Sequence, residues 1–254
     1  MYRVKRRIKQ SNLLVISNNS RTIEVAFESV VYHRSKLETY IRSHPTFQLA
    51  LDPVTVDEYA PRIVRLAAGA AEVAGVGPMA AIPGALAELA VEAMLSTGSE
   101  VNVVENGGEI AATSTSQLKV GIYAGRSALS GRVGFLLSRL DFPIGIATSS
   151  ATVSHALNFG QADAAVVVAD TSSMADAVAK AACNAANGED YEASVQSGLE
   201  AIEKIGHVRG ALIIRDRFIG MVGKLPELVK IEGTREEVLT TGLHSIAAPD
   251  ATIL

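Results

Sequence analysis

Three short polar segments contain the residue types that could hold a charged ligand. The first follows an apolar run ending at Val104 and reads Asn106-Gly107-Gly108-Glu109. Paired glycines let the backbone reach positive φ and let a ligand approach the main chain closely. The second segment is Thr148-Ser149-Ser150, and the third contains Asp176 and Lys180. Three such segments beside apolar runs predict a pocket for a nucleotide or another phosphorylated molecule.

Each segment also has a purely structural explanation, which the sequence alone leaves open. The two glycines could form a tight turn between strands, with Asn106 and Glu109 exposed. The hydroxyl triplet could cap a helix or lie in a loop. Asp176 and Lys180 are four residues apart on a predicted helix, where an exposed ion pair contributes only about 0.3–0.5 kcal/mol.

Further candidates lie beside these segments. His155 follows the hydroxyl triplet, which allows a serine–histidine nucleophilic pair. No carboxylate stands at a recognisable spacing to orient its ring, so a structural or ligand-contacting histidine is favoured. Glu88 lies on a predicted apolar helix and is a candidate for ribose or adenine contact. Gly77 lies in the glycine- and proline-rich segment 75–84, which could serve close helix packing or present backbone N–H groups to a phosphate.

Composition argues against several classes of function. The net charge of −4 disfavours nucleic acid, and 5% aromatic residues leave few rings on which bases could stack. The single Cys183 excludes an internal disulfide and predicts a small buried residue. No run reaches the ~18–20 apolar residues of a membrane span, and no signal-peptide core follows the charged N-terminus. We therefore expect a cytoplasmic protein that binds neither membrane nor nucleic acid.

Hydrophobic periodicity predicts both strands and helices around the polar segments. Strands are expected at 2–9, 13–16, 23–27, 100–104, 119–123, 144–147, 164–169, 211–214 and 218–222. Helices are expected at 29–43, 61–74, 85–95, 173–187 and 191–205, and residues 46–56 alternate again. Hairpin signals at both ends favour an α+β or mixed α/β sandwich over a parallel sheet. We expect one domain over 1–254, with a tail from about 233 that has no clear pattern.

Five segments in this order resemble one known family. They are Val76-Gly-Pro-Met-Ala-Ala81, 104–110, Ala147-Thr-Ser-Ser150, 155–164 and Ala175-Asp-Ala177. Over about residues 1–225 the chain is similar to the ApbE-related family of uncharacterised, mainly archaeal and bacterial proteins, cousins of the FAD:protein FMN transferases. The resemblance implies an ApbE-like (T-fold-like) sandwich of mixed sheet and helices, with FAD lying among these segments.

The same resemblance implies roles for individual residues. The turn Gly107-Gly108-Glu109 corresponds to a Gly-Gly-Asp turn that borders the flavin in the transferases. The triplet 148–150 corresponds to a Thr-Ser-Gly element that contacts the nucleotide. Asp176 corresponds to a magnesium ligand, and His155 to the histidine of a His-x-x-Asp-Pro turn, of which this chain lacks the aspartate and the proline.

Two departures from the transferase pattern bear on the activity. Lys180 stands where the transferases have a magnesium-binding threonine, and segment 83–88 lacks their lysine, with Glu88 in place of an aspartate. A protonated lysine cannot ligate Mg²⁺. Its ammonium could instead take the metal's place and neutralise a phosphate, held by Asp176. These departures argue against a magnesium site and against FMN transfer.

The resemblance therefore implies a protein that binds FAD, FMN or a related phosphorylated small molecule. If it is an enzyme, it resembles a flavin-nucleotide transferase or a pyrophosphatase, with Asp176, Lys180 and His155 as candidate catalytic residues. The alternative is a non-catalytic binding or accessory protein in cofactor, amino-acid or sulfur metabolism. The abundance of small and apolar residues also leads us to expect a homodimer.

Overall fold

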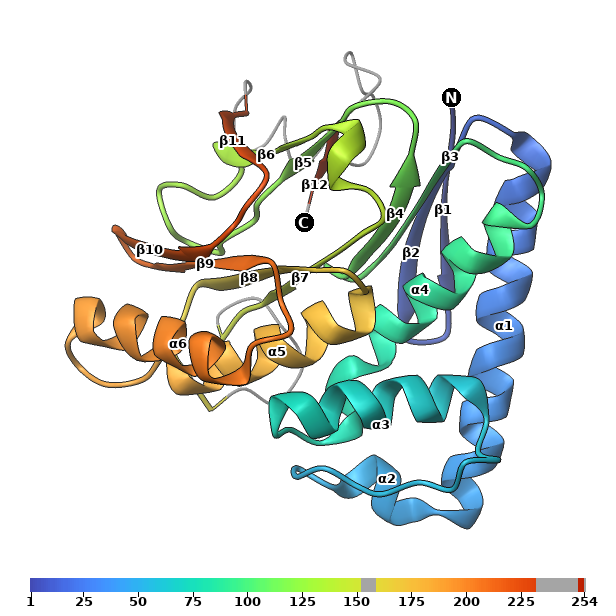
Figure 1. Ribbon diagram of the computed structural model, residues 1–254, viewed down its shortest axis with the longest axis horizontal. Helices are drawn as coiled ribbons and strands as arrows, with labels where there is room; N and C mark the ends of the chain where they lie inside the picture. The colour runs from blue at the N-terminus through green and yellow to red at the C-terminus, as the bar shows by residue number, and fades with distance from the viewer. Residues whose placement is uncertain (152–158, 232–250, 254) are drawn as a thin grey trace.

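Figure 1 shows a large β-sheet with helices on one face and a smaller sheet on the other. The computed structural model describes residues 1–151, 159–231 and 251–253. The segment 152–158, with His155, lies outside the described residues, and so does most of the tail expected from about 233.

The large sheet has the strand order β1-β2-β3-β4-β7-β8-β9-β10. Its strands are β1 Tyr2–Ile8, β2 Ser11–Ser17, β3 Val101–Asn106, β4 Ile110–Ser114, β7 Ile144–Ser149, β8 Ala164–Ala169, β9 Gly210–Arg215 and β10 Phe218–Gly223. Every neighbouring pair in this sheet is antiparallel. The smaller sheet has the order β11-β6-β5-β12, and its only parallel pair among the described residues is β5 with β12. Its strands are β5 Leu118–Gly121, β6 Val133–Leu137, β11 Glu227–Lys230 and β12 Ala251–Ile253.

The helices cover the face of the large sheet opposite the smaller sheet. They are α1 Ser20–Ser43, α2 Pro45–Leu49, α3 Arg62–Ala74, α4 Ile82–Leu95, α5 Ser172–Ala185 and α6 Tyr191–Ile205, with short 3₁₀ helices at Pro78–Ala81 and Arg139–Asp141. Helix α5 packs on β7 and β8, α4 on β3 and β4, and α6 on β9 and β10. The predicted α+β fold is confirmed, and among the described residues the β5–β12 pair supplies the parallel pairing of the predicted mixed sheet.

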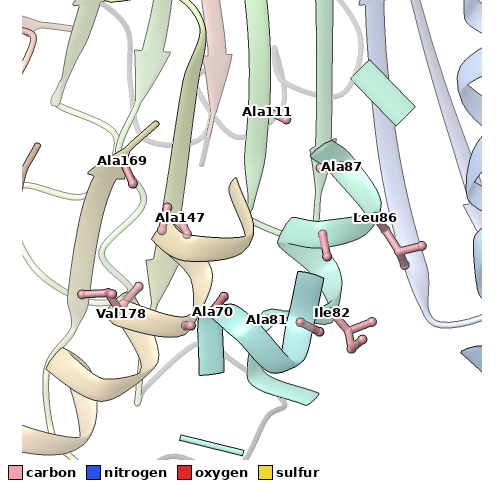
Figure 2. Packing of buried hydrophobic residues seen from close by; sticks show 14 of the residues in the cluster. Ala70, Ala81, Ile82, Leu86, Ala87, Ala111, Ala147, Ala169 and Val178 are labelled. Carbon is pink, nitrogen blue, oxygen red and sulfur yellow. The ribbon is translucent and has the colours of Figure 1, made fainter. Parts of the chain in front are cut away.

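Two apolar layers hold the elements together, one on each face of the large sheet. Strand alternation sends Val104, Ala111 and Ala147 towards the helices, and Val103 and Ile110 towards the smaller sheet. Figure 2 shows how small the side chains of the helix-side layer are, with alanines from strands and helices meeting face to face. Small side chains let helices approach the sheet closely, so polar groups on helix and strand can also come within reach.

Some local predictions were wrong. The strand expected at 23–27 lies inside α1, because Asn19 accepts the Arg21 N–H and caps a helix that begins at Ser20. Its buried residues recur at helical spacing, at Ile23, Ala26 and Val30. The alternating residues 46–56 contain the short helix α2 instead of a strand. Strands β4, β6 and β11 were not predicted; β4 consists of small and hydroxyl residues that carry a weak strand signal.

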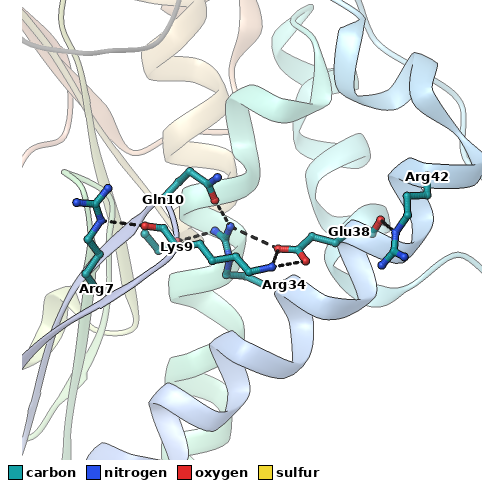
Figure 3. Close-up of polar contacts among 7 residues, drawn as sticks. Arg7, Lys9, Gln10, Arg34, Glu38 and Arg42 are labelled. Carbon is teal, nitrogen blue, oxygen red and sulfur yellow. Dashed lines mark hydrogen bonds and ion pairs between the residues drawn. The ribbon is translucent and has the colours of Figure 1, made fainter.

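The basic strand 2–9 is the edge strand β1, as predicted. Surface ion pairs connect β1 and the turn after it to α1, and the first joins Arg6 to Glu24 at 2.8 Å. Lys9 binds Glu38 at 2.5 Å, and Arg34 donates to Gln10 (Figure 3). By length and composition, one described segment, Pro78–Leu95, could cross a membrane, yet 61% of it is buried inside the protein.

Candidate functional site

One end of the large sheet brings two of the polar segments together on the helix side. The hairpin between β3 and β4 contributes Glu109, and α5 contributes Asp176 and Lys180. Glu109 is 9% exposed and Asp176 8% exposed, whereas Lys180 is half-buried. The exposed ion pair that the i, i+4 spacing allows is therefore not what forms, because Asp176 is buried.

The electrostatics of this cluster follow from burial. Burial raises the pKa of Asp176 to about 7, against the opposing effects of the Gly84 N–H and of Lys180. Burial raises the pKa of Glu109 well above its usual range, and the nearby charges of Asp176 and Glu105 raise it further. Burial lowers the pKa of Lys180, while Cys183 and the two carboxylates oppose this. Burial therefore favours the protonated forms of both carboxyls, and Asp176 changes its charge near neutral pH.

Gly84 explains why Asp176 is buried. A Cβ at residue 84 would overlap the Ser172 carbonyl, so only glycine allows α4 to pack this closely on α5. Asp176 Oδ2 then accepts the Gly84 N–H at 2.9 Å. This N–H belongs to the first turn of α4, where backbone donors have no partner within the helix. A carboxylate there is also favoured by the helix dipole.

The glycine pair does form a tight hairpin turn. Gly107 and Gly108 have φ values of 77° and 123°, and the Asn106 N–H donates to the Glu109 carbonyl at 2.9 Å. The structural alternative of exposed flanking residues was wrong, since Asn106 is 4% exposed and donates from Nδ2 to the Pro83 carbonyl at 3.0 Å. A Cβ at either glycine would meet nothing nearer than 3.7 Å. The backbone of the turn is therefore open to approach, and φ requires the glycines there.

The hydroxyl triplet is divided between the two faces of the sheet. Ser149 lies on the helix side and hydrogen-bonds the Cys183 thiol, whose pKa burial raises. Cys183 is fully buried, as predicted. Thr148 lies towards the smaller sheet, and its Oγ1 is buried without a hydrogen-bond partner in the described part of the chain. Ser150 is buried, and His155, for which a structural or ligand-contacting role was favoured, lies outside the described residues.

Glu88 and Gly77 have structural partners. Glu88 Oε2 accepts the Ser173 hydroxyl at 2.6 Å and the Ser173 N–H at 3.2 Å, which connects α4 to the start of α5. A Cβ at Gly77 would overlap the Ala50 carbonyl, so close packing after α2 requires glycine there. Their predicted contacts with a nucleotide stay predictions.

Sequence reasoning missed Glu105. It is half-buried on the face towards the smaller sheet, and burial raises its pKa to about 7 against the effects of Lys5 and Arg3. The available signal was its place in the alternation Val101, Val103, Glu105, where an apolar residue is expected.

The donor set does not fit a magnesium ion. Among the residues that the structure describes, no three His, Cys, Asp or Glu side chains are arranged to hold a metal. Mg²⁺ requires near-octahedral oxygen ligands, and here the ammonium of Lys180 adjoins the carboxyls of Asp176 and Glu109. A lysine beside carboxyls whose pKa values burial raises instead suits an anion.

Two surface cavities lie away from this cluster. One, of about 320 Å³, is mainly apolar and lies between the edges of the two sheets, where Ile219 and Met221 are exposed. The other, of about 220 Å³, lies beside Arg209 and Lys224. Neither cavity is lined by Glu109, Asp176 or Lys180. The candidate site is therefore the cluster of these three side chains.

The comparisons with known proteins agree with this architecture. The family model described as "AbpE bacteria" matches residues 2–203. The chain belongs to this family. A UPF0280 protein of Methanocaldococcus jannaschii is 39% identical, with 89% of this chain and 92% of that protein covered. A UPF0280 protein of Methanothermobacter thermautotrophicus is 41% identical, with 79% and 78% covered.

Solved ApbE structures show the same fold at low identity. The flavinyl transferase ApbE of Pseudomonas stutzeri has a TM-score of 0.55 and 14% identity, over 87% of this chain and 93% of that one. The ApbE protein of Thermotoga maritima has a TM-score of 0.55 and 15% identity, over 84% and 93%. The predicted ApbE-like fold and ApbE-related family are therefore confirmed.

Proposed function

We propose that the protein binds FAD, or a related phosphorylated small molecule, with a phosphate beside Lys180. The observation that carries the proposal is the meeting of Lys180 with the buried carboxyls of Asp176 and Glu109 at the open turn 107–108. Burial favours the neutral forms of those carboxyls, and an ammonium beside neutral carboxyls attracts an anion. The backbone of the turn lets the ligand approach closely.

The family supports a flavin as the ligand. The chain shares its fold with proteins that are named flavinyl transferases, and its Gly107-Gly108-Glu109 turn resembles the turn that borders the flavin in that group. In this arrangement Lys180 would neutralise phosphate, and Ser149 would lie on the same side of the sheet. FMN in place of FAD satisfies the same chemistry.

We further propose that FMN transfer is absent or inefficient, which favours a binding or accessory protein over a transferase or pyrophosphatase. The support is the donor set: the ammonium of Lys180 stands beside Asp176, and no three His, Cys, Asp or Glu side chains of the described residues could hold a metal ion. Incubation with FAD and Mg²⁺, followed by chromatography for FMN and AMP, tests this proposal. Rapid formation of both products would contradict it.

Lys180→Met tests the binding site itself. A charge-assisted hydrogen bond to a phosphate contributes about 1.5–3 kcal/mol, so the variant should bind FAD about 10- to 100-fold more weakly by fluorescence titration. Lys204→Met is the matched control, because Lys204 is exposed near the end of α6. Equal FAD affinity of the wild type and Lys180→Met would refute the proposed role of Lys180.

The setting of this function is also proposed. We place the protein in the cytoplasm as a homodimer that contacts neither membrane nor nucleic acid. The acidic composition and the burial of Pro78–Leu95 support this setting. Exposed apolar residues on β10, Ile219 and Met221, support a self-interface. Light scattering coupled to size-exclusion chromatography should give twice the monomer mass, and a monomer mass would contradict the dimer.

A further inference from the structure

Arg215 is a buried cation with which no carboxylate of the described residues forms an ion pair. It ends β9, is 7% exposed and stacks over the Tyr191 ring at 4.4 Å. Its Nη2 donates to the side-chain carbonyl of Gln161. Its Nη1 is buried without a hydrogen-bond partner among the described residues, and no described carboxylate forms an ion pair with it.

This arrangement is costly for the folded protein alone. Arginine is almost never buried unless it is paired, and an unpartnered buried donor loses its hydration without compensation. The neighbouring acid, Asp163, accepts the Asp216 N–H at 2.6 Å. A ligand anion would supply the missing partner.

The position of Arg215 relates it to the candidate site. Strands β7, β8 and β9 are consecutive, so Arg215 lies about two strand spacings, roughly 10 Å, from the strand of Ser149. Alternation places both residues on the helix side of the sheet, because Ile213 and Ala147 face the helices. The chain beside Arg215 is fixed to α5, since the Gln161 N–H donates to the Ala186 carbonyl at 2.8 Å.

We propose that Arg215 is a second anion-binding residue, which takes a phosphate group at the same end of the sheet as Lys180. Guanidinium matches phosphate oxygens with two parallel hydrogen bonds, and stacking on Tyr191 holds its plane. The carbonyl oxygen of Gln161 occupies the place of one phosphate oxygen in the unbound protein. This pairing rests on the proposed function, and it assigns to the ligand one anionic group at Lys180 and another at Arg215.

Inorganic phosphate is the probe that tests Arg215 independently of FAD. The Lys180→Met variant is used as the parent, because this substitution removes the first anion position. Its thermal unfolding is measured while potassium phosphate replaces potassium chloride at constant ionic strength. We expect the melting temperature to rise with phosphate, and adding Arg215→Gln to abolish that rise. Arg217→Gln is the control, because Arg217 is exposed in the turn between β9 and β10 and should leave the rise unchanged.

A merely structural arginine would behave differently. In that case Arg215→Gln lowers the melting temperature even without phosphate. The rise with phosphate is then either absent from the Lys180→Met parent or still present after Arg215→Gln is added. Either of these two results for the rise overturns the proposal. If Arg215→Gln does not fold, Arg215→Lys keeps the charge but loses the paired hydrogen bonds, and should weaken phosphate binding about tenfold. An unchanged phosphate affinity of Arg215→Lys would likewise overturn it. Failure of both FAD and FMN to bind would count against the proposed flavin ligand but would leave the phosphate result standing.

Discussion

Replacing Asp176 with asparagine should stabilise the protein most at high pH. The pKa of Asp176 is about 7 in the folded protein and has its ordinary value of 3.8 in the unfolded chain. The folded state therefore binds the proton more tightly between these values. The contribution of this group to stability is complete below about pH 4 and is lost as the pH rises through about 7.

The size of the effect follows from that difference. The folded pKa of about 7 lies about two pH units above pH 5, and each pH unit corresponds to about 1.36 kcal/mol. Ionisation of Asp176 should therefore lower the stability of the wild type by about 3 kcal/mol between pH 5 and pH 8. The asparagine of the variant cannot ionise, and its amide oxygen can still accept the Gly84 N–H. The fall in the variant should be smaller by about that amount.

Urea unfolding at pH 5 and pH 8 measures this difference. Asp52→Asn is the matched control, because Asp52 is exposed and should leave the wild-type pH dependence unchanged. If Asp176→Asn and the wild type lose the same stability between the two pH values, the burial argument for this carboxyl is wrong.

Three further substitutions test the packing at Gly84 and the raised pKa of Glu105. Gly84→Ala should lower the free energy of unfolding by about 1–3 kcal/mol, because its Cβ would overlap the Ser172 carbonyl. Gly69→Ala, with nothing within 4 Å of the new Cβ in α3, should instead stabilise by about 0.5–1 kcal/mol in the same urea titration. Equal effects of the two would contradict the crowding argument. Glu105→Gln should reduce the loss of stability between pH 5 and pH 8, since burial raises that pKa to about 7; an unchanged pH profile would show that Glu105 is solvated.

Periodicity identified the elements whose patterns are regular and buried. Strand β8, an unbroken apolar run, was predicted with its observed bounds, and α6 likewise. The start of α1 was missed because Ile23–Phe27 reads equally well as a short strand, and only the Asn19 cap decides for a helix. Strand β4 was missed because pairing with β3 and β7, and not side-chain propensity, holds it in place.

The candidate site was predictable only in part. The sequence indicated the glycine turn and the Asp176–Lys180 spacing as polar segments beside strands. It could not show that Gly84 lets α4 approach α5 and thereby buries Asp176, because that contact joins residues 92 positions apart. Nor could it separate Thr148 from Ser149, which face opposite sides of the sheet once the register of β7 is set. Arg215 gave no sequence signal, since its missing partner is visible only in three dimensions.

The most direct test is a crystal structure of the protein grown or soaked with FAD. The proposal predicts electron density for the ligand against the turn Gly107-Gly108, with a phosphate oxygen within hydrogen-bond distance of Lys180 Nζ. Ligand density confined to another surface, such as the groove beside Ile219 and Met221, would contradict it. So would a saturated crystal in which Lys180 stays packed against Glu109 and Asp176 with no ligand beside it.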